Sequence, residues 1–279
     1  MSLENLRAKN KISKKLAVRV TFFVVLVVLI VAGIWIWEQY ITVHEVPKGI
    51  APKPSDISSY AEGEFFSEHR KGYNTLLEKS FSSFYDALLG FGISAAIGTS
   101  IGIVFARSKA IKEGLTPPLF IMQLLPVPAF APVVAAITGY GVTTKILIIV
   151  LFTVYPFIIA GYDAVANIPK NYTALFSNYN ANWYTKFKSL ILPSIVPNLL
   201  HAMKIASTAS IVASIIAELP LTVSSGIGKD IYTSFNNQLI PRVWLSLIII
   251  SIISLLFFSF ISFLDKYINT RYKYGQFQK

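Results

Sequence analysis

The chain has 279 residues, of which 54% are hydrophobic and only 14% are charged. Typical soluble domains carry about 25% charged residues, whereas here the apolar residues are pooled into runs of about 20, the length that crosses ~30 Å of hydrocarbon. The absence of cysteine excludes disulfide scaffolds, thiol catalysis and cysteine metal sites. The net charge of +11 is typical of a membrane protein with basic cytoplasmic loops, and no aromatic-interleaved basic groove for single-stranded nucleic acid is seen. We therefore predict an all-α integral membrane protein that binds no nucleic acid.

The chain opens with a basic segment and an apolar run. Residues 1–18 are predicted to form a cytoplasmic tail, and residues 19–37 the first transmembrane helix. A cleavable signal peptide is the alternative, but the run is long, lacks a small-residue cleavage site and ends in Trp35 and Trp37, which suit the membrane interface. Residues 38–83 are hydrophilic and predict an external segment, partly helical near residues 62–78.

Five further apolar runs predict a five-helix core over residues 84–266, followed by a cytoplasmic tail at residues 267–279. The runs lie near residues 84–106, 118–138, 145–164, 191–217 and 244–264. Small residues recur every four positions in the first of these runs: Gly90, Ser94, Gly98, Gly102 and Ala106. Such a stripe lets another helix approach closely, so we interpret it as a packing surface.

The third of the six predicted spans, residues 118–138, contains three prolines: Pro126, Pro128 and Pro132. Proline removes a backbone donor and kinks helices. In a bilayer the freed carbonyls must be satisfied by protein or by a wet cavity. Kinked packing and a pore-lining helix both explain this pattern.

Orientation follows from the distribution of lysine and arginine. With the N-terminus inside, the inner segments hold 16 of these residues and the outer segments hold 8, Lys145 among them. This asymmetry predicts a multi-pass protein of the plasma membrane with both termini in the cytoplasm. Residues 167–189, between spans four and five, then form a cytoplasmic loop.

That loop carries apolar side chains at helical spacing. They are Tyr172, Leu175, Phe176, Tyr179, Trp183, Phe187 and Leu190. The spacing predicts one face of a helix, with Asn171 or Thr173 capping its start and Asn182 capping a second start. Such a helix either lies on the membrane surface or docks into a groove on a partner protein, and periodicity does not decide between them.

The residues after Tyr179 resemble the EAA loop of permease subunits of ABC importers. That motif places a glycine, nine residues, an aliphatic residue, any residue and Leu-Pro; here Asn180 stands at the glycine position, followed at this spacing by Leu190 and by Leu192-Pro193. Further stretches resemble the nitrate/taurine/sulfonate branch of this superfamily: Pro52-Lys53-Pro54-Ser55-Asp56, Pro126-Val127-Pro128, and Glu218 with Ser225-Gly226-Ile227-Gly228.

Two departures from the motif are visible. Ala174, Leu175 and Phe176 occupy the positions of the Glu-Ala-Ala triplet, so its acidic residue is missing. Asn180 replaces glycine, although asparagine is among the few residues that visit the left-handed region readily.

The resemblance implies a permease that pairs with a second copy of itself, most simply as a homodimer. It implies two cytoplasmic ATPase subunits, which hold ATP and Mg, and an external binding protein that delivers the solute. The implied coupling helix between spans four and five contacts the ATPase through Tyr179, Asn180, Ala181, Asn182, Trp183, Leu192 and Pro193. The branch implies a small anion such as a sulfonate, taurine or nitrate, or a vitamin precursor.

The chain itself lacks the phosphate-cradling Gly-x-x-x-x-Gly-Lys-Ser/Thr loop. We therefore expect it to bind no cofactor and to catalyse no reaction, with ATP hydrolysed by a separate chain. His44, His69 and His201 have no metal-ligand spacing, and we expect no metal site.

Ionisable residues within or near spans are functional candidates, because charge is costly in a bilayer. Asp86 and Asp163 fall near span ends, where hydration is cheap. Lys204 lies near the middle of the fifth span, either in an ion pair or as an anion-attracting charge, and Glu218 is expected at the outer mouth. The candidates for the translocation pathway are Pro126, Pro128, Lys204 and Glu218.

Two other functions are compatible with a six-span protein. A secondary transporter needs coupling charges deep in the membrane and usually internal repeats, and here only Lys204 is central. A non-transporting membrane scaffold is the second alternative.

Overall fold

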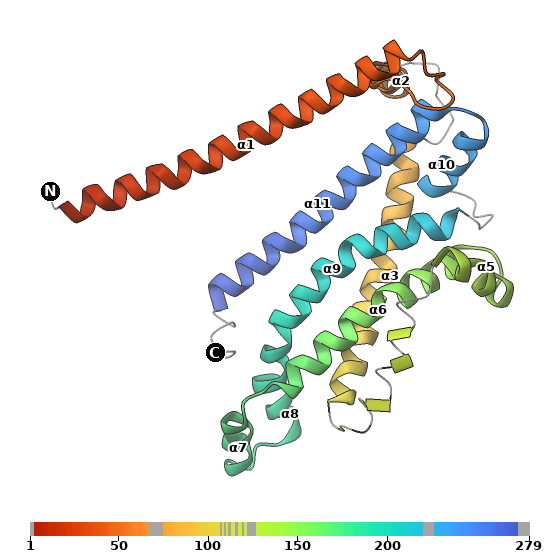
Figure 1. Ribbon diagram of the computed structural model, residues 1–279. Coiled ribbons are helices and arrows are strands. Elements are labelled where there is room, and N and C mark those ends of the chain that lie inside the picture. Colours follow the sequence, from red (N-terminus) through yellow and green to blue (C-terminus); the bar gives the residue numbers. More distant parts are fainter. Residues whose placement is uncertain are drawn as a thin grey trace. The chain divides into compact units, whose positions relative to one another are not determined.

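The computed structural model describes residues 3–66, 75–106, 108, 110, 113–114, 117–118, 120–121, 127–219 and 226–272. The elements in this part of the chain are helices, drawn in Figure 1. They are α1 (Leu3–Val43), α2 (Pro54–Phe66), α3 (Leu76–Phe105), α5 (Val127–Thr138), α6 (Val142–Ala166), α7 (Lys170–Asn178), α8 (Trp183–Lys186), the π-helical turn η2 (Phe187–Ile191), α9 (Leu192–Glu218), α10 (Ile227–Asn236) and α11 (Ile240–Tyr272).

Five of these helical segments are long and apolar enough to cross a membrane. They cover Val20–Val43, Leu76–Phe105, Val142–Ala166, Trp183–Glu218 and Ile240–Arg271. They correspond to the expected spans one, two, four, five and six. The third expected span contains α5, whose 12 residues rise only ~18 Å, and most of residues 107–126 lie outside the described part of the chain. A sixth crossing therefore stays a prediction.

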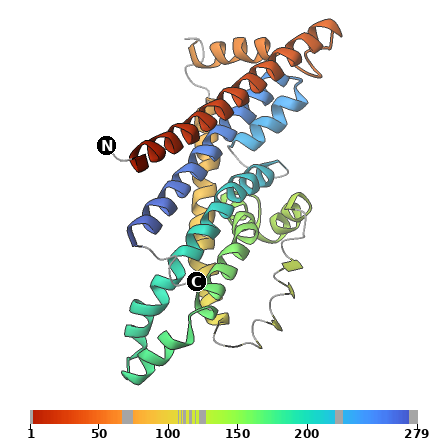
Figure 2. The same cartoon turned by 60° about the vertical axis from the view of Figure 1, so that its left-hand side comes forward.

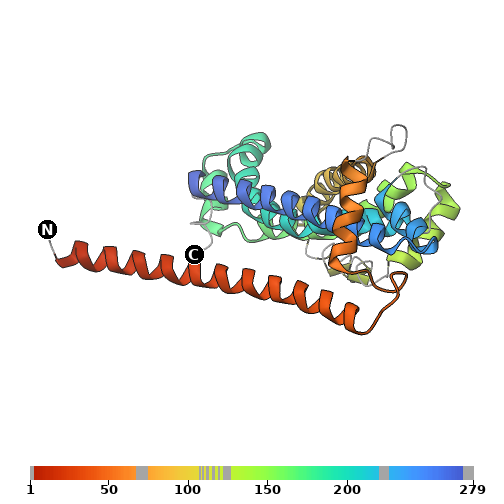
Figure 3. The same cartoon turned by 90° about the horizontal axis from the view of Figure 1, so that it is seen from above.

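The chain divides into two compact units, the first of which comprises Met1–Arg70 and Gln238–Leu245. Its helix α1 runs unbroken in all three views (Figures 1 to 3). The apolar side chains of α1 from Val20 to Val31 are exposed, as expected for a helix that faces lipid.

Polar contacts hold the rest of this first unit together. The Ser55 hydroxyl donates to Glu38 at 2.7 Å, and the Arg242 guanidinium contacts the buried carboxylate of Glu64 at 3.3 Å. The Lys48 ammonium donates a hydrogen bond to Asp56 at 2.6 Å and holds the pKa of that carboxyl below its usual value. Of the stretch expected to be partly helical, residues 62–66 belong to α2 and residues 76–78 to α3, while residues 67–74 lie outside the described part of the chain.

The second unit comprises Lys71–Asn237 and Ser246–Lys279, and its centre is the contact of α3 with α6 and α9. Three glycines of α3, Gly90, Gly98 and Gly102, face α6. A Cβ atom at Gly98 would lie 2.7 Å from both the Val154 carbonyl oxygen and Phe157 Cβ, and one at Gly102 would overlap the Ile158 carbonyl. The small-residue stripe is thus a packing surface, and α6 is the helix that it receives.

The order of these contacts fixes the direction of the helices. Gly90 lies against Ile149, whereas Gly102, twelve residues later, lies against Gly161. Because the contacts advance together along both helices, α3 and α6 run parallel. Helix α11 joins this core through Phe257, whose ring meets that of Phe91 edge-on at 5.3 Å.

Candidate functional site

The loop between α6 and α9, residues 167–191, is the first candidate site, and we call it the α6–α9 loop. Helix α7 ends at Asn178, and Asn180, two residues later, is left-handed with φ of 49°. The Asn180 N–H donates to the Ser177 carbonyl and the Ala181 N–H to the Phe176 carbonyl, both at 3.0 Å. This is the Schellman arrangement that terminates helices, usually with glycine at the left-handed position. Asn180 thus adopts the left-handed conformation that glycine usually takes at this position.

A second helix starts directly after this turn. The Asn182 side chain accepts a hydrogen bond from the Thr185 N–H at 2.8 Å and caps α8, as the sequence predicts. At the start of α7, however, the cap is Pro169, and neither Asn171 nor Thr173 takes that position. The prediction of one helix face from Tyr172 to Leu190 is wrong, because the reversal at Asn180 divides the segment into α7 and α8.

Helix α8 continues into α9 through one wide turn, η2. The Leu192 N–H donates to the Phe187 carbonyl, five residues back. Pro193 follows it and has no N–H, and in a regular helix its ring would clash with the carbonyl four residues earlier. The wide turn therefore lies where proline disfavours the regular helix, and Leu192 and Pro193 stand at the junction of the loop with α9.

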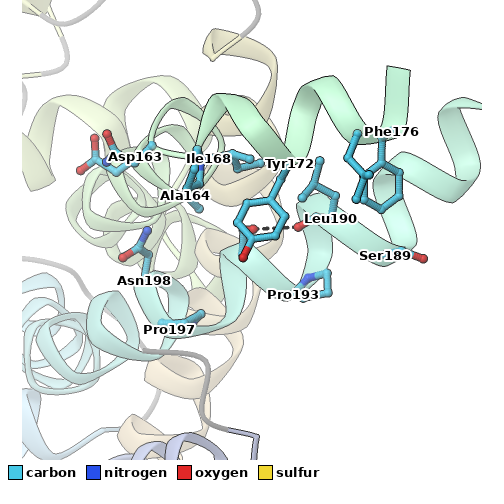
Figure 4. A pocket seen from close by; sticks show the side chains of 14 residues that line it. Asp163, Ala164, Ile168, Tyr172, Phe176, Ser189, Leu190, Pro193, Pro197 and Asn198 are labelled. Atoms are coloured by element: carbon cyan, nitrogen blue, oxygen red, sulfur yellow. Dashed lines mark hydrogen bonds between the residues drawn. The ribbon is translucent and has the colours of Figure 1, made fainter. Parts of the chain in front are cut away.

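A cavity of about 320 Å³ lies between the end of α6, helix α7 and the start of α9 (Figure 4). Its lining residues include Asp163, Ile168, Tyr172, Phe176, Leu190, Pro193, Pro197 and Asn198. Apolar side chains that the sequence placed on one helix face thus line a space enclosed by three elements. No hydrogen bond or ion pair of the Asp163 carboxylate is seen among the described residues.

Aromatic rings cover the tip of the α6–α9 loop. Residues Tyr179, Trp183 and Tyr184 are 80%, 60% and 63% exposed, and Trp183 stacks on Phe187 at 5.3 Å between ring centroids. This tip, formed by the end of α7 and by α8, lies beyond the ends of α6 and α9 (Figure 1). Apolar groups exposed in this way mark a surface that contacts another molecule.

A second cluster joins α3, α6 and α9 at the opposite end of the second unit. The Lys145 ammonium pairs with Asp86 at 2.6 Å and with Glu218, and we call these three residues the Lys145 cluster. Lys145 and Glu218 are fully buried and Asp86 is nearly so. The Glu218 carboxylate also accepts hydrogen bonds from the Ser83 hydroxyl and the Gly228 N–H, each at 2.6 Å.

The Lys145 cluster corrects two expectations: Lys145 is buried within α6 and does not belong to an outer loop, and the Asp86 carboxylate is buried, not hydrated. Glu218 is the last residue of α9 and is buried as well, and its place at the outer mouth stays a prediction. Each charge is instead compensated by groups from other helices, which is the condition under which charges are retained in protein interiors.

The comparison with known families decides the class of the molecule. Residues 88–274 match the family described as the binding-protein-dependent transport system inner membrane component. The chain belongs to this family.

Individual relatives agree with this assignment. The nitrate import permease protein NrtB of Synechocystis sp. is 26% identical over 185 residues, covering 66% of this chain and 67% of that protein. The formylaminopyrimidine transport permease protein ThiX of Halalkalibacterium halodurans is 26% identical over 180 residues, covering 63% and 70%. In structure, the inward-facing MetNI methionine ABC transporter matches with a TM-score of 0.59 at 14% identity, covering 69% of this chain and 95% of that one. This last likeness shows the fold.

In this transport component the two expected pathway charges that the structure describes, Lys204 and Glu218, lie in different places. Lys204 pairs with Asp265 of α11, and the other Asp265 oxygen accepts from the Asn269 amide at 2.6 Å. Lys204 therefore takes part in an ion pair, one of its two expected roles. Glu218 lies 14 residues further along α9, ~21 Å away at 1.5 Å per residue. Pro126 lies outside the described residues, and Pro128 is in the first turn of α5.

The Lys145 cluster is the part of the transport component that sequence reasoning missed. One signal was available, since Asp86 and Lys145 each stand at the start of an apolar run and Glu218 directly follows the end of another, and alternating spans would place these three run ends on the same side of the membrane. The cluster was missed because Lys145 was assigned to an outer loop. Helix α6 in fact begins at Val142, three residues before Lys145.

Proposed function

We propose that this chain is the transmembrane permease subunit of an ATP-binding-cassette importer and that the α6–α9 loop couples it to separate ATPase subunits. The observation that carries this proposal is the left-handed turn at Asn180, which separates α7 from α8 in the part of the loop that lies beyond the ends of α6 and α9 (Figure 1). The turn stands where the importer motif has glycine, and membership of the transport family supports the same role.

The loop has the physical properties of a docking surface. Its aromatic tip is exposed, and Tyr and Trp are the residues that most often anchor protein interfaces. Ala181 is small and half-buried, so a partner surface can approach the backbone of the turn closely. The loop lies beyond the long apolar helices, which favours a protein partner over a place in the bilayer.

The coupling scheme follows from this contact. Two copies of the chain form the solute pathway, an external binding protein delivers the solute, and two ATPases that hold ATP and Mg each receive one α6–α9 loop. Helix α8, the turn η2 and α9 form one continuous segment from Trp183 to Glu218. Movement of the ATPases at α8 is then carried along α9 across the membrane, while this chain itself hydrolyses nothing.

The substrate in this proposal is a small polar solute. One relative is named for nitrate and another for formylaminopyrimidine, which correspond to the two classes that the sequence motifs imply. We propose a small anion first, such as nitrate, taurine or another sulfonate, and a vitamin precursor second. Mass spectrometry of the solute held by the cognate binding protein decides between them.

We predict that Ala181→Glu abolishes transport by releasing or uncoupling the ATPase. The backbone bond from Ala181 to Phe176 survives the change, whereas the new carboxylate must be desolvated in the interface. Central interface positions commonly cost more than ~2 kcal/mol when disrupted, a factor of about 30 in affinity. Co-purification of the ATPase and solute-stimulated ATP hydrolysis measure the effect.

Two further variants of the loop serve as comparison. Ala181→Ser keeps the small side chain and is expected to behave as wild type. Trp183→Ala removes a ring from the rim of the contact and should weaken assembly less than Ala181→Glu does. If Ala181→Glu retains both the ATPase and its stimulation, the coupling role is wrong, and the loop is better explained as a membrane-surface anchor.

A further inference from the structure

The charges of the α6–α9 loop all have one sign. Its cations are Lys170, Lys186 and Lys188, and it contains no aspartate or glutamate, so its net charge is +3 (three lysines, no acid). The nearest acidic residues along the chain are Asp163, within α6, and Glu218, which is buried in the Lys145 cluster. The loop therefore has no acidic residue of its own to balance its lysines.

The structure leaves these lysines uncompensated as well. Within the residues that it describes, none of the three takes part in an ion pair, whereas Lys79, Lys145 and Lys204 in the same unit each do. Lys170 and Lys188 are exposed and Lys186 is half-buried. The Lys188 ammonium lies 6.0 Å from the centre of the exposed Tyr184 ring, so one cation adjoins the aromatic tip.

We propose that the α6–α9 loop binds an acidic cleft, one whose apolar floor receives Trp183 and Tyr184 and whose carboxylates face Lys186 and Lys188. This inference rests on the proposed function and adds the chemistry of the partner surface, namely the ATPase. Like charges facing each other across an interface cost several kcal/mol, so a cation-bearing loop selects a complementary, negative surface. An ATPase with a basic cleft could therefore not replace the cognate ATPase on this permease.

An anionic membrane surface is the other binding partner that basic and aromatic residues can select. The geometry favours the protein partner. Helices α7 and α8 lie beyond the ends of α6 and α9 in Figure 1. Tyr179 is the residue that ends α7, and Trp183 and Tyr184 belong to the short helix α8 that starts after the reversal at Asn180. The rings thus lie in the middle of the loop, separated along the chain from Ala166, where α6 ends, and from Leu192, where α9 begins.

The test is the affinity of the purified ATPase for the permease in nanodiscs made of phosphatidylcholine alone. The charge-reversal variant is Lys186→Glu/Lys188→Glu. Its matched control is Lys266→Glu/Arg271→Glu, which changes the net charge equally at exposed positions near the end of α11. Both are measured at about 0.1 M and about 0.5 M salt, since screening shortens the reach of charges as salt rises. Lys186→Gln/Lys188→Gln serves in addition if charge reversal lowers the yield.

We expect the reversal to raise the Kd at low salt at least about tenfold, and to remove most of the salt dependence that the wild type and the control share. Wild-type affinity in the reversal variant would overturn the acidic cleft; if Ala181→Glu still releases the ATPase, the proposed coupling role survives that result. Failure of Ala181→Glu as well would overturn both. Salt dependence that appears only when anionic lipid is added to the discs would assign the lysines to the membrane and also overturn the inference.

Discussion

Lys145 compensates two carboxylates that have been removed from water. Asp86 comes from α3, Glu218 from α9 and Lys145 from α6, and the Lys145 ammonium contacts both acids. A buried pair of this kind contributes little net stability compared with apolar packing, but removal of one partner is costly because the other charge is left buried and uncompensated. In the Lys145 cluster, loss of the cation would leave two such charges.

We predict that Lys145→Met destabilises the permease by about 3–5 kcal/mol. The exposed lysine Lys266 supplies the control, and Lys266→Met should leave stability unchanged. Adding Glu218→Gln to Lys145→Met should recover part of the loss, because it removes one uncompensated charge. Thermal unfolding of the purified protein is the measurement, and a wild-type melting temperature for Lys145→Met would contradict the buried ion pairs.

The Lys145 cluster also shows why the count of lysines and arginines wrongly placed Lys145 in an outer loop. The count treats each lysine near an apolar run as part of a hydrated loop, yet α6 begins at Val142 and encloses Lys145 in its first turn. The partners come from helices 59 and 73 positions away along the chain. A single sequence contains the three ionisable residues and their positions at the ends of apolar runs, but it does not say which helices pack against each other to bring them together.

The helix elements were largely predictable, because five apolar runs became helices of spanning length. The four-residue spacing of small residues in α3 also identified its packing face, although not that α6 would be the partner. In the α6–α9 loop, periodicity failed, since a left-handed residue at Asn180 ends a helix without interrupting the apolar pattern. The asparagines at positions 180 and 182 were the local signals for the turn and for the second start.

We predict that Gly98→Leu and Gly102→Leu each lower stability, by about 1–3 kcal/mol or more. A side chain at either position meets the backbone of α6, at the Val154 carbonyl for Gly98 and at the Ile158 carbonyl for Gly102. Gly92 is the matched control on the same helix, because nothing lies within 4 Å of a Cβ atom placed there. The melting temperature and yield of the purified protein report the effect, and equal values for Gly98→Leu and Gly92→Leu would contradict the contact with α6.

At the scale of the whole molecule, the parallel course of α3 and α6 constrains the number of crossings. Both helices have spanning length, so a chain that leaves α3 on one side of the membrane must return before it enters α6. The segment between Phe105 and Val142 contains α5, which packs against α6 and α9 and is too short to span alone. We therefore expect residues 106–141 to complete the sixth crossing that the apolar run at residues 118–138 predicted.

Single cysteines test this crossing and the orientation together. The natural chain has none, so Ser58→Cys in α2 and Ser177→Cys in α7, both exposed positions, each provide one thiol. With a return crossing, three segments separate the two positions and place them on opposite sides; without it, two segments separate them and place them on the same side. The excess of basic residues in the inner segments further predicts that position 58 is external.

An impermeant thiol reagent should therefore label Ser58→Cys in intact cells and leave Ser177→Cys unreacted. Permeabilised cells provide the control, since both thiols must react there if position 177 is exposed as the structure has it. Labelling of both positions in intact cells would show two crossings between them and exclude the return through residues 106–141. Labelling of position 177 alone would keep three crossings but invert the orientation, and the α6–α9 loop would then face away from any cytoplasmic ATPase.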